Sequence, residues 1–465
     1  MPVAGKYDLV IKGGNVVLLD EVRNLDIAVK NGMIVELAEQ ISGDGENVLD
    51  ASGQYVLPGM IDAHVHFNEP GREDWEGFRH GSGLLAAGGC TTYFDMPLNN
   101  IPSTVDVAAL LDKANRGGSE SRVDFALWGA LVPGNEEELE GLANHGVIGF
   151  KAFLSPTGTP EFEAVDDLTL YRGMKRIAGL NRILALHSES APIIHCLEAE
   201  KKGTTVRDYC ETRPVLAEME AVSRALLMAR ETGCSLHFVH ISSARTVRLI
   251  QEAKAAGLDV TLETCPHYLL FNIEDFERLG SVAKCAPPLR EEAERLQLWE
   301  ALVSGQIDMI TSDHSPCPTS MKTAHEHDMF QAWGGITGGQ FSLEAMIDQG
   351  HVERRLPLTQ IARWTAIHPA KRFGLYPRKG VLSVGSDADL ALVSLNQDHL
   401  ITEQDLLSRY RHSPYIGRRF RCRVTATIQR GTIVYTLRDG VMEQPRGQWL
   451  QPCEAAQAEG RTIKA

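Results

Sequence analysis

The chain has 465 residues, which exceeds one ordinary hydrophobic core and indicates a large domain with a smaller companion. Hydrophobic residues make up 43% and charged residues 23% of the sequence, as in a globular protein, so the composition excludes general disorder. The formal net charge of −15, without any dense run of lysine and arginine, excludes nucleic acid as the expected partner.

The N-terminus and the cysteines indicate the compartment. The first residues, MPVAGKYDLV, lack a basic segment followed by an apolar one, and no run approaches the roughly 18 apolar residues of a membrane span. Nine cysteines are scattered without any C-x-x-C pair, so neither a disulfide framework nor a thiolate zinc cluster is indicated. We therefore expect a cytoplasmic protein with no membrane partner.

Both ends of the chain are rich in short strands. Residues 1–57 include YDLVIKGGNVVLLD and DIAVKNGMIVELA, with Gly13-Gly14 and Asn31-Gly32 as hairpin signals. Residues 376–465 repeat this pattern in GSDADLALVSL and RVTATIQRGTIVYTLRDG. These two distant segments predict a single small β-sandwich assembled from both ends.

The middle of the chain, residues 58–375, alternates short apolar runs with helical stretches, a pattern typical of βα units. One helix is well marked over Val215–Glu231, because Pro214 suits a first turn and Gly233 follows as a stop. Eight such units predict an α/β fold with a closed (β/α)8 TIM barrel. The eight runs are YVLPGMIDAHVHF, CTTYFDMP, VDFALWGALV, VIGFKAFL, RILALHSES, SLHFVHIS, DVTLETCPHYLL and DMITSDHSP.

Residues that bind metals occur at the polar ends of these runs. The carboxyl ends of barrel strands meet at one mouth, where active sites are built. The first run ends His64-Val65-His66, and alternate residues of a strand face the same side, so both imidazoles can bind one ion. Any one of these residues alone would more often be structural, but together they predict a metal centre. The remaining candidate ligands are Lys151, His187, His240 and Asp313.

Lys151 lies in the apolar stretch GFKAF, where an unpaired ammonium is costly and its pKa tends to fall. A neutral amine reacts with CO2, and the resulting carbamate could bridge two cations. The alternative is a lysine that pairs with a carboxylate or extends toward the mouth. Beside four histidines and Asp313, we favour carboxylation of Lys151 to N6-carboxylysine.

Other histidines have different expected roles. Strand alternation points His237 and His314 away from the mouth, so we expect both to be structural. His267, at the end of the seventh run, is equally compatible with a structural role and with support of a metal ligand. His325 and His327 fall in the polar stretch SPCPTSMKTAHEHDMFQAWGG, which we interpret as a mobile loop.

This ligand set, together with the stretches DAHVH, CAPPLR, SDHSPC and GSDADLAL, resembles the binuclear cyclic-amidohydrolase branch of the amidohydrolase superfamily. That branch includes dihydroorotases, hydantoinases, dihydropyrimidinases and allantoinases, and the resemblance covers almost the whole chain. It implies two divalent ions bridged by carboxylated Lys151 and by a hydroxide. It also implies that the more buried ion is bound by His64, His66 and Asp313. The more exposed ion would be bound by His187 and His240.

The resemblance further implies that Asp313 carries the proton from the hydroxide to the leaving ring nitrogen. Main-chain groups near Cys285 and Gly335 are implied to bind the ring amide. The metal is open: zinc is the default, and cobalt, manganese or iron would suit the same ligands. The carbamate requires CO2, and the family commonly forms homotetramers.

Substrate choice depends on loops beside the metals. Dihydroorotases usually have an arginine two positions after the second histidine of H-x-H, and this chain has Asn68 there, which argues against an anionic ring. The stretches HFNEPGREDWEGF and DMPLNNIPST resemble allantoinases, and Asn68, Asn99 and Ser315 could serve a neutral substrate. The resemblance therefore implies opening of the hydantoin ring of allantoin to allantoate, in purine catabolism.

Two alternatives remain. The first is a hydantoinase or dihydropyrimidinase, which would open a related ring at the same metals. The second is a non-catalytic scaffold, because relatives exist that keep the barrel and have lost metal ligands. All six ligand positions are filled here with competent residue types, which disfavours the scaffold.

Overall fold

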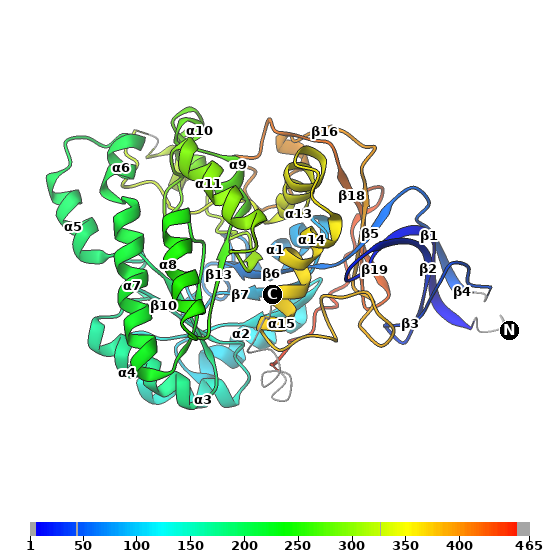
Figure 1. Ribbon diagram of the computed structural model, residues 1–465, viewed down its shortest axis with the longest axis horizontal. Coiled ribbons are helices and arrows are strands. Elements are labelled where there is room, and N and C mark those ends of the chain that lie inside the picture. The colour runs from blue at the N-terminus through cyan, green and yellow to red at the C-terminus, as the bar shows by residue number, and fades with distance from the viewer. Residues whose placement is uncertain (1–5, 43–44, 326, 453–465) are drawn as a thin grey trace.

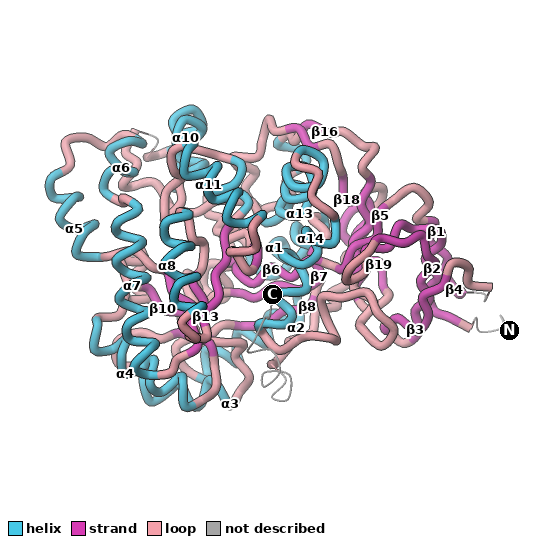
Figure 2. Tube along the Cα trace, in the orientation of Figure 1, coloured by secondary structure: helices cyan, strands magenta, loops and turns pink. Residues whose placement is uncertain are grey.

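The computed structural model describes residues 6–42, 45–325 and 327–452. A β-rich part lies at one end of the molecule, and a larger part with many helices forms the rest (Figure 1). Figure 2 shows strands concentrated in the first part and helices on the outside of the second. Of the predicted C-terminal segment, residues 453–465 lie outside the described ranges.

The β-rich part is a nine-stranded sheet to which both ends of the chain contribute. Its order is β20-β19-β18-β15-β5-β1-β2-β3, with β4 also paired to β1. Strand β5 joins the two halves, since it runs parallel to β1 and antiparallel to β15. The predicted assembly from both ends is thus present as one sheet. Its strands are β1 (Tyr7–Val17), β2 (Val22–Lys30), β3 (Met33–Ala38), β4 (Gly45–Asp50), β5 (Tyr55–Pro58), β15 (Leu390–Ser394), β18 (Arg423–Gln429), β19 (Thr432–Thr436) and β20 (Gly440–Val441).

The larger part contains two parallel sheets whose strands follow chain order, β6-β7-β8 and β9-β10-β11-β12-β13-β14. An isolated parallel bridge joins Val65 in the first strand to His314 just after the last. Parallel strands in chain order agree with the predicted βα units, although the ladders do not form a continuous ring. The strands are β6 (Met60–Val65), β7 (Cys90–Asp95), β8 (Asp124–Leu127), β9 (Gly129–Ala130), β10 (Phe150–Phe153), β11 (Ile183–His187), β12 (Ser235–Phe238), β13 (Val260–Thr264) and β14 (Met309–Ile310).

Three of the eight predicted runs are wrong as single strands. The third divides at Trp128 into β8 and β9, which belong to different sheets. The first run divides at Gly59 into β5 and β6, which belong to different sheets. A Cβ atom at Gly59 would lie 2.2 Å from Thr91 Oγ1, so only glycine fits at this division. The seventh run ends as a strand at Thr264, and Pro266 opens helix α9 (Pro266–Leu270). Buried helices and buried strands are equally apolar, so hydrophobicity alone does not separate them.

Helices connect and cover the parallel strands (Figure 1). The predicted helix is confirmed as α7 (Val215–Thr232); Pro214 is its N-cap, and Gly233 ends it in the left-handed region at φ 70°. No helix of the described ranges is long and apolar enough to cross a membrane. The other principal helices are α1 (Gly77–Ala87), α2 (Val107–Glu120), α3 (Leu139–Asn144), α4 (Asp167–Gly179), α5 (Ala191–Glu200), α6 (Val206–Thr212), α8 (Ala244–Ala255), α10 (Ile273–Leu279), α11 (Glu292–Val303), α12 (Ser320–Thr323), α13 (Ser342–Met346), α14 (Leu358–Ala362) and α15 (His368–Arg372).

A buried ionic cluster ties the two parts together. The Lys379 ammonium lies 2.6 Å from Asp124 Oδ2, at the start of β8, and 2.6 Å from Asp389 Oδ2, just before β15. It also lies 3.0 Å from Asp387 Oδ2, and Arg430 adds a second cation on Asp124. The three carboxylates could suit a metal ion by spacing, but Lys379 already provides the positive charge among them. The cluster is therefore a structural connection.

We expect Lys379→Met to lower the free energy of unfolding by about 3–5 kcal/mol, because it leaves buried carboxylates without their shared cation. Denaturant unfolding of purified protein measures this change. The control is Lys175→Met on the exposed face of α4, which should change stability by less than about 0.5 kcal/mol. Equal stability of the two variants would contradict the structural role.

Candidate metal centre

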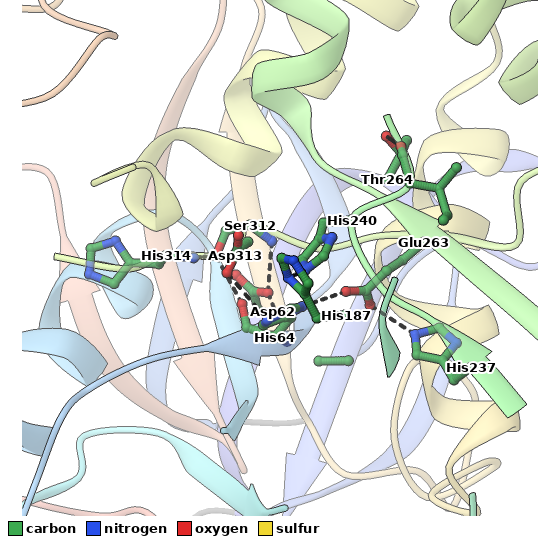
Figure 3. A network of polar contacts seen from close by, with 12 residues as sticks. Asp62, His64, His187, His237, His240, Glu263, Thr264, Ser312, Asp313 and His314 are labelled. Carbon is green, nitrogen blue, oxygen red and sulfur yellow. Dashed lines mark hydrogen bonds and ion pairs between the residues drawn. The ribbon is translucent and has the colours of Figure 1, made fainter. Parts of the chain in front are cut away.

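The structure brings the predicted ligands together although they are far apart in the chain. His64 lies in β6, Lys151 in β10 and His187 at the end of β11. His240 and Asp313 follow β12 and β14 within a few residues. Figure 3 shows His64, His187 and His240 gathered around the Asp313 carboxylate. All six predicted ligand side chains are buried or nearly so.

A first group is formed by His64, His66 and Asp313, whose candidate ligand atoms all lie within 4.8 Å of one another. Asp313 Oδ1 is 3.2 Å from His64 Nε2 and 3.3 Å from His66 Nε2. Burial alone would raise the pKa of Asp313, but the neighbouring imidazoles, His64 above all, outweigh it and hold that pKa below its usual value. The carboxyl is therefore ionised, as a metal ligand must be.

A second group is formed by His187 and His240. His187 Nδ1 lies 3.1 Å from His240 Nε2, and the ring centroids are 4.7 Å apart. The His187 ring stacks on Phe153, with centroids 4.4 Å apart and planes at 10°, which fixes its plane. His240 also lies beside His64, with centroids 5.4 Å apart, so the two groups adjoin.

Lys151 is fully buried, and its Nζ makes no hydrogen bond within the described ranges. It lies 4.9 Å from the centroid of the Phe153 ring. Burial lowers the pKa of Lys151 to about 7, against the opposing influence of the Asp313 and Glu263 carboxylates. An amine of this kind is partly neutral near pH 7 and so is available for reaction with CO2.

The arrangement of several buried polar atoms at the site fits a cation as their common partner. In the hydrogen bond between His187 Nδ1 and His240 Nε2, only one of the two nitrogens can be the donor. His64 and His66 both present Nε2 to the same oxygen of Asp313. Lys151 Nζ has no partner where a buried polar atom is expected to have one. Imidazole and carboxylate donors suit a divalent metal, so the residues present fit a metal centre.

Two buried glutamates orient the imidazoles, and neither was predicted from sequence. Glu263 Oε1 accepts from His64 Nδ1 at 2.7 Å, and its Oε2 accepts from His237 Nε2 at 3.0 Å (Figure 3). Burial would raise the pKa of Glu263, but the hydrogen bonds from His237 and His64 hold it at about 2. Glu189 Oε2 accepts from His187 Nε2 at 2.9 Å and pairs with Arg213 at 3.2 Å.

These contacts select the tautomers. A proton on His64 Nδ1, donated to Glu263, leaves the Nε2 lone pair free beside Asp313. A proton on His187 Nε2, donated to Glu189, leaves Nδ1 free beside His240. The free nitrogens are thus the ones that face the two candidate ion positions. His237, which was predicted to be structural, contacts the second oxygen of the Glu263 carboxylate. Its other ring nitrogen, Nδ1, forms a hydrogen bond with Thr261 Oγ1 at 2.9 Å.

We expect Glu263→Gln to lower metal affinity about 10–100-fold while the fold is kept, because the amide no longer holds His64 in this tautomer with a charged acceptor. Competition with a chelator measures the affinity. The matched control is Glu218→Gln, a buried glutamate that accepts from the Ser242 N–H and hydroxyl and touches no candidate ligand. Unchanged affinity in Glu263→Gln would assign the orientation of His64 to other groups.

Several residues of the site have left-handed backbone angles that non-glycine residues rarely adopt. The φ angles are 40° for His240 and 46° for Asp313, and 66° and 67° for Asn68 and Asn99. Such strain concentrates at functional sites, where the surrounding structure enforces it. In this molecule the left-handed conformation turns the chain at His240 and Asp313, just after their strands end, and so sets the direction of these two side chains.

A cavity of about 440 Å³ opens in front of these groups. The predicted substrate residues Asn99 and Ser315 line it, as do five of the six predicted metal ligands, all except Lys151. Asn68, Cys285 and Gly335 do not line it. Asn68 Nδ2 instead donates to Pro316 O at 3.3 Å. The cavity wall does include Ala286 and Gly334, the neighbours of Cys285 and Gly335.

The main-chain oxygens of Cys285 and Gly335 already have partners. Cys285 O accepts from the Tyr209 hydroxyl at 3.0 Å, and Gly335 O accepts from Lys322 Nζ at 2.8 Å. A Cβ atom at Gly335 would lie 2.5 Å from Ser315 O, so glycine is needed where these loops meet.

The remaining histidines lie off the cavity. His314 is buried and accepts from the Gly338 and Gly339 N–H groups, at 3.3 and 3.4 Å, and Figure 3 shows its ring pointing away from the other imidazoles. His267 is buried in α9, and burial lowers its pKa to about 4. His325 and His327 do not line the cavity, but other residues of their predicted loop do, including Phe330 and Trp333.

Comparison with known proteins agrees with this geometry. The model of the amidohydrolase family matches residues 55–441. The chain therefore belongs to the amidohydrolase family, as its motifs predicted.

Within that family the chain is similar to proteins named allantoinase. It is 51% identical to the one from Bacillus velezensis, with 96% of this chain and 98% of the relative covered. It is 48% identical to the one from Rubrobacter xylanophilus, with the same coverage of both chains. Among solved structures, the L-hydantoinase from Arthrobacter aurescens matches with a TM-score of 0.93 at 34% identity, covering 96% of this chain and all of that one.

Proposed function

We propose that this protein is an allantoinase, which hydrolyses the hydantoin ring amide of allantoin to give allantoate. The observation that carries the proposal is the full set of metal-ligand types converging on one cavity, together with 40–51% identity to proteins named allantoinase over nearly the whole chain. The reaction is hydrolysis of a cyclic amide.

The walls of the cavity support a neutral substrate. Three cationic side chains line it, but two are already compensated: Arg72 pairs with Glu161 at 2.8 Å, and Arg213 with Glu189 at 3.2 Å. Burial lowers the pKa of the third, Lys284, to about 7. No uncompensated guanidinium among the described residues faces the cavity to hold a substrate carboxylate. A ring with several amide and ureido groups fits polar walls of this kind.

The second candidate is a hydantoinase or dihydropyrimidinase, and the structural similarity favours it as an alternative. The L-hydantoinase from Arthrobacter aurescens shares the fold over the whole of its length. It is less similar in sequence, at 34% identity against 51% for the allantoinase from Bacillus velezensis. The filled ligand set disfavours a scaffold without activity.

We infer that His64, His66 and Asp313 would hold one divalent ion, and His187 and His240 the other, with Lys151 as a carbamate between them. Zinc is the default metal. Two such ions lower the pKa of a bound water and polarise the scissile carbonyl. The carbamate is supported by the burial of Lys151, its unpartnered Nζ and its lowered pKa.

Asp313 is proposed as the proton carrier. Its carboxylate is ionised, lies beside His64 and His66 and lines the cavity, so it can accept a proton from the attacking water and return it to the ring nitrogen. Asp62 Oδ1 accepts from the Ser312 N–H at 2.9 Å and so fixes the chain just before Asp313. The ring nitrogen would otherwise leave as an unstable anion.

The wider organisation is also part of the proposal. We propose a closed (β/α)8 barrel over residues 58–375 and a β-sandwich formed by residues 1–57 and 376–465. The cysteines of the described ranges are all free, which supports a reducing compartment such as the cytoplasm. The family resemblance supports a homotetramer, which sedimentation of the purified protein tests.

A substrate panel tests the proposed activity. Allantoin, hydantoin, dihydrouracil and dihydroorotate are compared by kcat/KM with one metal-loaded preparation. We expect allantoin to exceed the others by at least about tenfold, which corresponds to about 1.4 kcal/mol of selective transition-state binding. A larger kcat/KM for hydantoin or dihydrouracil would replace the proposal with the second candidate.

Metal analysis of active protein should approach two divalent ions per chain. We expect His64→Ala and His187→Ala to lose metal and activity while circular dichroism stays near that of the wild type, because these side chains lie at strand ends. The Glu218→Gln control should keep both ions. A fully active preparation with a single ion per chain would remove the binuclear centre from the proposal.

A further inference from the structure

One wall of the cavity, residues 330–335, has no regular secondary structure. Five residues of this segment line the cavity: Phe330, Gln331, Ala332, Trp333 and Gly334. Its main-chain groups have no helix or strand ladder to satisfy them, so other groups must hold the backbone in place. The shape of the cavity on this side depends on those groups.

Two buried lysines supply that support. Lys322, in α12, donates through Nζ to Trp333 O and Gly335 O, both at 2.8 Å, and to Ser281 O at 2.9 Å. Lys284, directly before the CAPPLR stretch, donates to Ala332 O at 2.5 Å and to Phe330 O at 3.5 Å. Four carbonyls of one short segment thus face two ammonium groups.

Neither ammonium forms an ion pair with a carboxylate among the residues that the structure describes. The side chains are nevertheless deeply buried, since Lys322 is 1% and Lys284 5% exposed. Burial lowers the pKa of Lys322 to about 8 and that of Lys284 to about 7. A buried charge of this kind is costly, and a methionine would fill the same space without that cost. The hydrogen bonds to these carbonyls are therefore what the two lysines provide and methionine would not.

The orientation of the carbonyls determines that of the N–H groups. In a trans peptide unit the N–H points opposite to the C=O. The Trp333 carbonyl points to Lys322, which is buried and does not line the cavity, so the Gly334 N–H of the same unit points away from that lysine. The Gly334 N–H donates to no acceptor within the described ranges, and Gly334 lines the cavity. A carbonyl bound by a cation also makes the N–H of its peptide a stronger donor.

We propose that Lys322 and Lys284 are positioning residues, which hold residues 330–335 so that the Gly334 N–H faces the cavity as a donor to a substrate carbonyl. This role rests on the proposed hydrolysis of a cyclic amide, whose carbonyl oxygens accept such a bond. It acts on binding of the substrate and leaves the candidate metal ligands untouched, because neither lysine contacts them.

Lys322→Met and Lys284→Met test this role against Lys254→Met. Lys254 is a matched control because its ammonium also joins two segments, at 2.5 Å from Asp308 Oδ1, and it does not line the cavity. Hydrogen exchange over residues 330–335 is followed in protein without substrate, and steady-state kinetics with allantoin and metal content are measured in parallel. We expect exchange at least about tenfold faster in both variants than in the control.

We also expect the KM for allantoin to rise about tenfold, with kcat within a factor of about three and metal content unchanged. Exchange and KM equal to those of the control would overturn the proposal, and so would faster exchange with an unchanged KM. If Lys322→Met does not fold, Lys284→Met carries the test through Phe330 and Ala332. If the wild type does not hydrolyse allantoin, the proposed function fails. Hydrogen exchange then still tests the role of the two lysines, and KM is measured with the preferred substrate of the panel.

Discussion

Asp313→Asn is expected to lower kcat by two to four orders of magnitude, about the contribution of a positioned proton carrier. The side chain keeps its size and one oxygen toward His64 and His66, so part of the metal affinity should remain. An amide can neither accept the proton of the attacking water nor return it to the ring nitrogen. The loss should therefore fall on kcat in metal-saturated enzyme more than on KM.

The control for this variant is Asp308→Asn, at the other end of β14. Asp308 is also buried and accepts from the Leu262 N–H at 2.9 Å, but it lies away from the cavity. Its substitution should lower stability and leave kcat nearly unchanged. Near-normal turnover of Asp313→Asn at full metal occupancy would assign the proton transfer to another group.

The convergence of the candidate ligands could be predicted from sequence because parallel strands deliver their last residues to one edge of the sheet. His64 and His66 share a side by strand alternation, and His187, His240 and Asp313 each follow an apolar run. The same rule placed His314 correctly, with its ring turned away from the site (Figure 3). Such inferences need only the direction and the end of a strand, both of which the hydrophobic pattern carries.

The supporting groups were missed for physical reasons. Glu263 lies inside the run of β13, whose hydrophobic pattern predicts a buried strand in spite of this one charged residue. A glutamate in the middle of a buried strand needs a partner, and that requirement was the available signal. Glu189, two residues after His187, repeats the spacing of His64 and His66 and could have been found in the same way.

The substrate loops were harder to predict, because a contact through the main chain depends on which way each peptide turns. The family resemblance implied main-chain groups near Cys285 and Gly335, and the structure puts their neighbours Ala286 and Gly334 on the cavity wall. The lysines that bind carbonyls of residues 330–335, Lys284 and Lys322, carry no motif of their own. Their roles depend on burial and on hydrogen bonds to carbonyls elsewhere in the chain, such as Ala332 O for Lys284 and Gly335 O for Lys322, which the sequence pattern does not show.

Lys151→Ala is expected to be nearly inactive, because it removes the anion proposed between two cations, where an ammonium would instead repel them. Carboxylation uses the neutral amine, and with a pKa of about 7 the neutral fraction of Lys151 rises as the pH increases through 7. Recovery of activity by metal-free wild type should therefore be faster at pH 8 than at pH 6, at equal dissolved CO2 and metal. Removing CO2 should slow it at both.

In Lys151→Ala the vacated space should admit a short carboxylic acid, whose two oxygens can replace part of the bridge. Acetate or propionate should restore part of kcat, and chloride at the same ionic strength should not, because it offers no pair of oxygens. Intact-protein mass measured under native conditions should show the added CO2 in the active wild type and not in the variant. Active wild type with two bound metals and an unmodified Lys151 would contradict the carbamate, whereas metal-free protein is uninformative because the carbamate then dissociates.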